Sequence, residues 1–494
     1  MRRSVVVLWI AVLCVGIVSA QNNRLSVIID TDMAADDWTA LLYLLQHPAA
    51  DVLAVTVTGT GETTCPTGAR NAINLLTLTG DIRVPVACGS STPLEGSHTF
   101  PQEWRDAVDR MVGLSLPRNP FSPDERGAVE LLRDVLSRSA VPVTVITLGP
   151  LTNLAELLTV SPEVAGQITR IVVMGGAVDV PGNIEANVAG NPYAEWNVYV
   201  DPAALSVVLK SGVPVMLVGL DATNDVPVTP AFLRALGRDR STSAANFVYD
   251  ALQQEISLVL SERRSFWDPL TAAAALDVSL ITSETRQLSV VTVDGPELGR
   301  TAVDPDGTTV TVAISADAGR FEQSLLNVLN GRAPDATLSM PAPTAPALGA
   351  ELARRYYDEL WSQGNDSAFS ELLDPAFQVY SNSEDYAADA GGLRAILDQL
   401  RVYLPDMQIE VRQIVVDGET AAVRFVLTGT HTGISGAIEP TGQQVAVTGQ
   451  SMLTFYDGKI AEDRFTFDTF ALITRLGILP PEAIAEMYAR MGGN

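Results

Sequence analysis

An acidic cluster near the start of the chain offers the clearest chemistry in the sequence. Residues 30–37 read Asp-Thr-Asp-Met-Ala-Ala-Asp-Asp and hold four carboxylates. Crowded carboxylates repel one another, and their pKa values rise unless a cation neutralises them. A set of oxygen ligands favours a hard cation, Ca²⁺ or Mg²⁺. Helix capping is the alternative, because Asp suits a helix N-terminus, but capping accounts for only part of the cluster. The cluster therefore predicts a metal site or an acid–base site.

The segments on either side predict that this cluster lies at the edge of a sheet. An apolar run before it is typical of a buried strand, and residues 38–45 predict a buried helix. Strand-like and helical patterns alternate as far as residue 220, which indicates an α/β fold with an open, mostly parallel sheet and helices on both faces. In such sheets the chemistry lies where strands end and helices begin. The expected strands are 25–29, 52–58, 84–87, 143–148, 171–174 and 215–218, followed by a mostly helical stretch, 229–277, and by strands at 288–293 and 308–314.

The length of the chain indicates two or three domains. The chain has 494 residues, of which 47% are hydrophobic, and a formal charge of −26. The apolar fraction suffices for large cores, and the acidic charge argues against nucleic acid or an anionic membrane as a partner. A proline-rich stretch indicates a linker, after which the pattern changes to α+β. We therefore expect a first domain at 21–332, a linker at 333–350 and a second domain at 351–494.

Residues 1–20 have the pattern of a secretory signal peptide. Two arginines at positions 2 and 3 precede an apolar stretch, and Val-Ser-Ala at 18–20 fits a cleavage site. An uncleaved anchor is the alternative, although the apolar stretch is short for a bilayer span. We expect cleavage and a secreted or extracytoplasmic protein with no membrane contact afterwards. In that compartment Cys65 and Cys88 can form a disulfide.

The acidic cluster resembles the Asp-Thr-Asp-x-Gly-x-Asp-Asp signature of the inosine–uridine preferring nucleoside hydrolase family. Further segments match that family in order, and the resemblance extends from about residue 25 to residue 331. It implies an enzyme that hydrolyses the N-glycosidic bond of ribonucleosides, with Ca²⁺ as the cofactor. The matching segments are Gly-Pro-Leu-Thr-Asn at 149–153, Ile-Val-Val-Met-Gly-Gly at 171–176, Gly-Asn at 182–183 with Ala-Glu-Trp-Asn at 194–197, and Ser-Phe-Trp-Asp-Pro-Leu at 265–270.

The resemblance implies a calcium site made of carboxylates and one main-chain oxygen. In this sequence the carboxylates are Asp32, Asp37 and Asp268, and the carbonyl is that of Leu148. In the family the ion binds the ribose hydroxyls and the attacking water. Asp32 matches the general base that takes the proton of this water.

The resemblance also implies a ribose subsite. Breaking an N-glycosidic bond gives the ribose ring oxocarbenium character, so carboxylates and oriented hydrogen bonds stabilise the transition state. Thr60 follows the strand after which the family often has an asparagine that contacts the ribose, and a hydroxyl cannot copy an amide. The expected ribose contacts are Asp36, Thr60, Met174, Asn183, Glu195 and Asn197.

Trp267 is the main departure from the family pattern. Much of the family has a histidine there, as the proton donor to the leaving base, and an indole cannot act as a general acid. Other members resemble this chain, and an aromatic ring stacked on the base aids the departure of an electron-rich base, purine especially. We therefore expect Trp267 to assist catalysis, with a core tryptophan as the alternative. Stacking favours a purine nucleosidase, but the sequence does not choose between purine nucleosides, pyrimidine nucleosides and another riboside. His47, at a helix end, and His98, in a polar loop, are poor replacements.

Residues 351–480 resemble the SnoaL-like polyketide cyclase family, whose fold is a cone-shaped α+β barrel. Matching segments include Gly-Thr-His-Thr-Gly at 429–433 and Asp-Gly-Lys-Ile at 457–460. His431 and Asp468 match pocket residues that act in acid–base chemistry in the family, and such a pair is chemically competent. The fold also often serves as a small-molecule pocket or as a dimerisation module.

Two other functions fit parts of the pattern. A non-catalytic, calcium-stabilised riboside-binding protein would explain the missing histidine and asparagine, but the intact aspartates argue against it. A haloacid-dehalogenase-like phosphatase also has two aspartates after a strand, yet it requires Thr or Val where this chain has Ala34. We therefore predict an exported, calcium-dependent nucleoside hydrolase whose partner is a nucleoside or another riboside. Assembly as a homodimer or a tetramer is left open.

Overall fold

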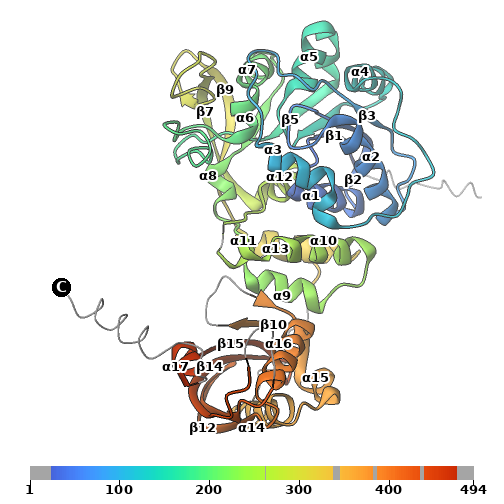
Figure 1. Ribbon diagram of the computed structural model, residues 1–494. Helices are drawn as coiled ribbons and strands as arrows, with labels where there is room; N and C mark the ends of the chain where they lie inside the picture. Colours follow the sequence, from blue (N-terminus) through green and yellow to red (C-terminus); the bar gives the residue numbers. More distant parts are fainter. Residues whose placement is uncertain (1–23, 262, 338–344, 382–386, 434–438, 476–494) are drawn as a thin grey trace, which may run out of the picture.

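The larger of two folded units surrounds a nine-stranded sheet (Figure 1). The computed structural model describes residues 24–261, 263–337, 345–381, 387–433 and 439–475, so the expected signal peptide at 1–20 lies outside the described residues. The strand order is β3-β2-β1-β4-β5-β6-β9-β7-β8. Neighbouring strands are parallel except that β7 runs antiparallel to β8 and β9. The predicted mostly parallel α/β sheet is confirmed. Its strands are β1 Leu25–Thr31, β2 Ala50–Val57, β3 Val86–Cys88, β4 Val143–Thr147, β5 Ile168–Met174, β6 Val215–Val218, β7 Ile281–Val290, β8 Thr301–Val303 and β9 Thr308–Ala316.

Helices cover both faces of this sheet, and each face has its own hydrophobic core. Central strands such as β4 are buried along their whole length, because Val and Ile side chains point into both cores. One core packs α1 Ala35–Gln46, α10 Ser243–Gln254, α12 Trp267–Leu276 and α13 Ala318–Leu329 against the sheet. The other packs α4 Ala128–Arg138, α5 Thr152–Val160 and α7 Pro202–Leu209. The remaining helices of this unit include α2 Cys65–Leu75, α3 Gln102–Asp109, α6 Trp196–Val200, α8 Leu220–Thr223, α9 Pro230–Arg238 and α11 Ile256–Leu260.

The structure joins Cys65, at the start of α2, to Cys88, at the end of β3, in a disulfide whose Cα atoms lie 5.5 Å apart. The bond ties a helix on one face to an outer strand of the sheet. None of the helices in the described part of the chain is long and apolar enough to cross a bilayer.

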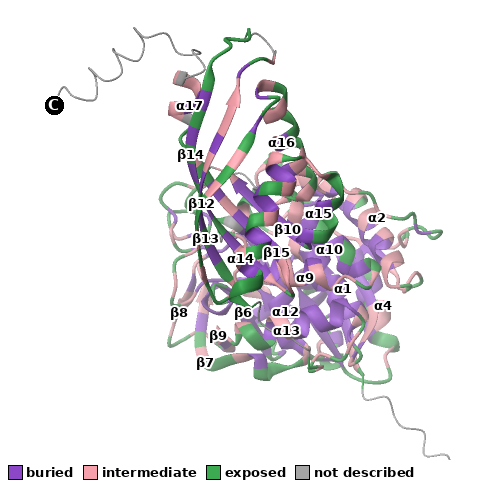
Figure 2. Ribbon diagram, turned by 90° about the horizontal axis from the view of Figure 1, so that it is seen from below, coloured by how far each residue is buried: buried purple, intermediate pink, exposed green. Residues whose placement is uncertain are grey.

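The smaller unit is an α+β domain with a six-stranded sheet of order β11-β10-β15-β14-β13-β12. Its first helix begins at Pro346, inside the segment expected to be a linker. Buried and exposed residues alternate along β13 and β14, the period expected of strands with one buried face (Figure 2). The elements are α14 Pro346–Arg355, a π-helix Tyr356–Ser362, α15 Asp366–Leu372, β10 Leu373–Ser381, β11 Ala387–Ala388, α16 Ala390–Tyr403, β12 Gln408–Asp417, β13 Thr420–Thr430, β14 Gln444–Tyr456, β15 Lys459–Phe467 and α17 Thr469–Arg475.

The two units meet where α9 packs on β10 and β15 of the smaller domain (Figure 1). Arg234 pairs with Glu462 and Arg238 with Asp374, and all four side chains are mostly buried. The guanidinium of Arg238 also lies 3.5 Å from the ring centroid of Tyr456. The helical layer of α9, α10, α11 and α13 therefore lies between the large sheet and the smaller domain.

Candidate active site

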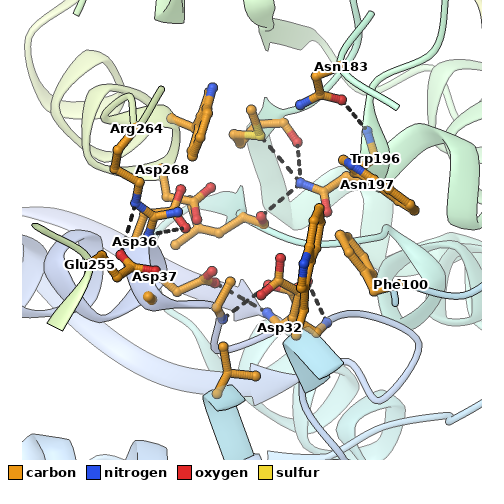
Figure 3. Close-up of a pocket in the computed structure, with 18 of the residues that line it drawn as sticks. Asp32, Asp36, Asp37, Phe100, Asn183, Trp196, Asn197, Glu255, Arg264 and Asp268 are labelled. Carbon is orange, nitrogen blue, oxygen red and sulfur yellow. Dashed lines mark hydrogen bonds and ion pairs between the residues drawn. The ribbon is translucent and has the colours of Figure 1, made fainter. Parts of the chain in front are cut away.

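A cavity of about 480 Å³ opens at the carboxyl edge of the large sheet (Figure 3). This volume suits a small-molecule site. One half is polar and is formed by the ends of β1, β4 and β5 together with the first residues of α1, α6 and α12. The other half is formed by aromatic and charged side chains from α3, α6, α11 and α12 and from the loops that precede them. The predicted site residues that line the cavity are Asp32, Asp36, Asp37, Leu148, Met174, Asn183, Glu195, Asn197, Trp267 and Asp268.

The acidic turn owes its shape to a strained residue and to close backbone contacts. Met33 has a φ of 57°, a left-handed conformation that costs a non-glycine residue on the order of 1 kcal/mol. Its carbonyl accepts a hydrogen bond from the indole of Trp38 at 2.8 Å. A Cβ at Gly61 would lie 2.1 Å from the Cβ of Asp32, so only glycine fits there. The turn is thus held in the conformation that presents Asp32 to the cavity.

Asp30, the first aspartate of the cluster, supports this turn from behind. Its Oδ1 accepts hydrogen bonds from the hydroxyl of Thr56 at 2.6 Å and from the amide of Asn153 at 2.8 Å. It does not line the cavity. Its contacts therefore link β1 to β2 and α5, a structural role.

Three carboxylates form the tightest acidic group of the site. One oxygen from each of Asp36, Asp37 and Asp268 lies within 4.8 Å of the others. Asp37 Oδ2 and Asp268 Oδ1 are buried and have no hydrogen-bond partner among the described residues. Buried polar atoms without partners are costly, and these oxygens suit a hard cation such as Ca²⁺. Their arrangement therefore fits a metal ion.

The membership of this group differs in one residue from the predicted ligand set. The sequence predicted Asp32, and the group contains Asp36 in its place. Asp32 lines the same cavity, with Oδ2 accepting the N–H of Glu62 at 3.0 Å and Oδ1 that of Ala34 at 3.4 Å. Asp36 Oδ1 lies 3.3 Å from the guanidinium of Arg264.

Burial and mutual repulsion disfavour the ionised form of these carboxylates. Burial raises the pKa of Asp32 to about 6. Burial and the charge of Asp32 hold the pKa of Asp37 well above its usual value, and burial with the charges of Asp36 and Asp37 does the same for Asp268. A divalent cation would reverse these shifts, because it stabilises the charged form.

The predicted ribose contacts are connected by hydrogen bonds at the other side of the polar half. Glu195 caps α6 by accepting the N–H groups of Asn197 and Val198, and it also accepts that of Gly176. Burial raises the pKa of Glu195 to about 7, against the opposing effect of these hydrogen bonds. The amide of Asn197 donates to the carbonyl of Leu148 at 3.0 Å. The network therefore orients the carbonyl oxygen that was predicted as a metal ligand.

Thr60 does not line the cavity, contrary to its predicted place beside the ribose. Its hydroxyl is hydrogen-bonded to Thr58 at 2.8 Å and to Thr152 at 3.0 Å. Glu62, two residues later, lines the cavity instead. The loop places Glu62 there because its N–H is bound by Asp32, a contact that periodicity in the sequence does not reveal.

Several side chains of the other half were missed by the sequence reasoning. Phe100 stacks on Trp196 with ring centroids 5.1 Å apart, and Trp104 meets Trp196 edge-on at 5.3 Å. The available signal was the spacing of Phe100 and Trp104, two large aromatic residues only four positions apart. Arg264 and Glu255 also line this half, where they form an ion pair.

The histidines lie elsewhere. His47 is buried at the end of α1, and burial lowers its pKa to about 4. His98 lies against Tyr199 and faces Asp294. Neither lines the cavity, so the prediction that they are poor proton donors is consistent with their positions.

In the smaller domain the predicted His431 and Asp468 have separate contacts. His431 is fully buried, and its Nδ1 lies 3.1 Å from the hydroxyl of Thr441. Asp468 is exposed and caps α17 by accepting the N–H of Ala471 at 2.8 Å. Their contacts do not assemble an acid–base pair.

A buried group of carboxylates beside an aromatic cavity, at the carboxyl edge of an open α/β sheet, is suited to hold a hard metal ion next to a small ring-bearing substrate. Comparison with known proteins specifies the class. A sequence model of the inosine-uridine preferring nucleoside hydrolase family matches residues 27–323, and the chain belongs to that family. It is a nucleoside hydrolase. A model of the SnoaL-like polyketide cyclase family matches residues 351–476.

Individual relatives agree with this assignment. The pyrimidine-specific ribonucleoside hydrolase RihA of Escherichia coli (strain K12) is 36% identical over 292 residues, which cover 57% of this chain and 88% of that protein. A purine-preferring ribonucleoside hydrolase from Gardnerella vaginalis has a solved structure with a TM-score of 0.55 and 27% identity, covering 63% of this chain and all of that one. The inosine-uridine preferring nucleoside hydrolase of Bacillus anthracis gives a TM-score of 0.56 and 25% identity, over 62% of this chain and all of that one.

Proposed function

We propose that this chain is an exported, calcium-dependent ribonucleoside hydrolase that releases free base and ribose. The observation that carries the proposal is the group of Asp36, Asp37 and Asp268, whose oxygens approach within 4.8 Å at the wall of an aromatic cavity. The ligands of the ion are Asp37, Asp268 and the carbonyl of Leu148, with Asp32 or Asp36 completing the carboxylates. When bound, Ca²⁺ supplies positive charge for the ribose hydroxyls and for water.

The side chains of the polar half bind and orient the ribose. Glu195, Asn197 and Asn183 line the cavity wall that faces the acidic turn, and Met174 lies beside Asn197. The carboxylates of the acidic turn and of Glu195, on opposite walls of the cavity, stabilise the positive charge that develops on the ribose as the glycosidic bond breaks. Asp32 takes the proton of the water that attacks C1′. The N–H groups of Ala34 and Glu62 hold its carboxylate in a fixed position for this step.

The base occupies the aromatic half in this proposal. Trp267 lines it from α12, Trp104 from α3 and Trp196 from the start of α6, and Phe100 lines it from the loop before α3. A larger ring gains more from stacking, which supports purine nucleosides as the better substrates. The name of the Escherichia coli relative states the opposite preference for that enzyme, so a direct comparison of inosine with uridine decides the question.

The decisive experiment measures base and reducing sugar released from purine and pyrimidine ribonucleosides, with added Ca²⁺ and with a chelator. We expect release that stops with the chelator and returns with Ca²⁺. The variant Asp32→Ala should lose activity while it still binds the nucleoside. Tight calcium binding without hydrolysis of any riboside would instead identify a binding protein.

Export is proposed from the leader-like residues 1–20, and the disulfide between Cys65 and Cys88 supports an oxidising compartment. Mass spectrometry of the protein from culture medium or periplasm should find an N-terminus at Gln21. Light scattering on the same preparation measures the oligomeric state, for which a homodimer or a tetramer is the prediction.

A further inference from the structure

Arg264 places a buried positive charge at the aromatic half of the cavity. Its side chain is 12% exposed, and its guanidinium lies 5.2 Å from the ring centroid of Trp267. Nη2 lies 3.3 Å from Asp36 and Nε lies 3.3 Å from Glu255, so two carboxylates fix its position (Figure 3). The residue lies directly before the 265–270 segment that carries the last predicted metal ligand. It therefore lies between the ribose side and the base side of the cavity.

The reaction needs a group that accommodates the departing base. When the bond between C1′ and the base nitrogen breaks, its electron pair goes to the base, which becomes an anion unless it is protonated. All three histidines of the chain are described, and none lines the cavity. The indole of Trp267 is not an acid. Glu255 is held in an ion pair with Arg264, so its negative charge would oppose that of the base. Glu62 belongs to the acidic side of the cavity, where Asp32 accepts its N–H and burial raises the pKa of its carboxyl well above the usual value.

We propose that Arg264 is a catalytic residue that stabilises the departing base as an anion, by donating N–H hydrogen bonds to its ring nitrogen or carbonyl oxygen. The inference rests on the proposed function and assigns a role in that same site. The water oxygen bonds to C1′, its proton passes to Asp32, and the electron pair of the broken bond stays on the base. The base is then protonated by solvent after release.

The geometry suits this role better than a purely structural one. A guanidinium has five N–H donors in a rigid fork and does not lose its charge in proteins. Among the residues that the structure describes, the two ion pairs of Arg264 engage Nη2 and Nε, so Nη1 remains to meet a ligand. Desolvation strengthens the attraction of this cation for a developing anion. Trp267 then supplies the stacking surface, and the arginine beside it supplies the charge.

The test compares substrates that differ only in the leaving group. The variant Arg264→Gln is assayed with inosine, with uridine and with p-nitrophenyl β-D-ribofuranoside, whose p-nitrophenolate leaves as a stable anion without help. We expect kcat/KM for the nucleosides to fall roughly 10²- to 10³-fold, the usual cost of removing one preorganised charge-stabilising donor. Activity on the nitrophenyl riboside should change much less, so that the ratio between the two kinds of substrate moves by at least roughly 10-fold.

Two further variants sharpen the result. Arg264→Lys keeps the charge but not the fork, and it should show a smaller change in the same ratio; it also replaces Arg264→Gln if that protein does not fold. Arg240→Gln is the matched control, because Arg240 lies 4.2 Å over the ring of Tyr249 and does not line the cavity. It should leave every rate unchanged.

Equal losses on all three substrates would overturn the proposal, because they would mean that Arg264 acts only through Asp36 on the shared ribose. No loss on any substrate would overturn it as well. If the unaltered enzyme hydrolyses the nitrophenyl riboside and no nucleoside, or nothing at all, the proposed function itself fails, and that outcome is visible before any variant is measured.

Discussion

Replacing Arg238 with alanine should weaken the attachment of the second domain to the first. Arg238 ends α9, and its Nε donates to Asp374 Oδ2 at 3.0 Å. Asp374 is only 5% exposed, and its Oδ1 accepts the N–H of Ala376 at 2.8 Å. The same guanidinium lies over Tyr456. One side chain thus carries a buried ion pair and a cation–π contact across the boundary between the domains.

The expected cost follows from what remains after the substitution. Loss of one partner from a buried ion pair leaves the other charge unpaired and costs about 3 kcal/mol, at the low end of the usual range because Arg238 keeps some contact with water. The cation–π contact adds about 1 kcal/mol. When the two domains unfold together, the free energy of unfolding should therefore fall by about 4 kcal/mol.

The assay is urea denaturation of the full chain at saturating Ca²⁺, followed by tryptophan fluorescence and by circular dichroism. The variants Arg238→Ala, Asp374→Ala and the double variant give the coupling free energy between the two side chains. The control is Arg412→Ala, because Arg412 and Glu410 form an exposed ion pair within β12, worth at most about 0.5 kcal/mol. A coupling energy no larger than that control would refute the reasoning, since it would mean that α9 and the second domain do not share these contacts in solution.

Two other outcomes are expected. Burial raises the pKa of Asp463 in the second domain to about 7. Because this value in the folded protein exceeds the value in the unfolded chain, the folded state is favoured by the protonated carboxyl. The full effect on the free energy of unfolding is present near pH 4, and about 4 kcal/mol is lost as the pH rises to about 8. Melting temperatures at saturating Ca²⁺ should thus fall more steeply over this range for the natural chain than for Asp463→Asn, and parallel curves would contradict the assignment. Replacing Cys65 and Cys88 together by serine should lower the free energy of unfolding by about 3 kcal/mol, from the 23-residue separation; an unchanged urea midpoint would show that the bond does not form.

Most of the polar half of the site could be predicted because its residues follow the elements directly. The acidic cluster lies between a continuous apolar strand and an apolar helix, and both periods are visible in the sequence. Parallel strands end at one edge, so Met174 and Leu148 had to come near Asp32. The positions of such residues depend on the order of parallel strands and helices, and this order follows from the alternation of strand-like and helical patterns in the sequence.

The residues that were missed depend on loop paths. Thr60 and Glu62 belong to one Gly-rich turn, and the choice between them depends on how the backbone passes Asp32, which no period encodes. Arg264 meets Asp36 across 228 residues of sequence. Nothing in the sequence next to this arginine, which lies just before the 265–270 segment, indicates that its partner is Asp36.

The second domain contains a signal that the sequence did offer. Ala461, Asp463 and Phe465 alternate along β15 and so share one face, which predicts a buried aspartate. In the structure Asp463 accepts a hydrogen bond from the hydroxyl of Tyr356 at 2.7 Å and another from Ser451. The polar group inside this domain is therefore centred on Asp463 and not on the predicted His431 and Asp468.

The two halves of the cavity differ in how freely they can change. The ribose half is held by strand ends and by helices buried in the core, so a substitution there disturbs the sheet itself. Much of the base half comes from the start of α3 with the loop before it and from the segment between α11 and α12. That segment continues the helical layer of α9 to α11, whose outer surface carries the second domain. A change in how the second domain packs on α9 is therefore expected to alter the position of Arg264 and the binding of the base more than the position of Asp32 and the binding of the ribose.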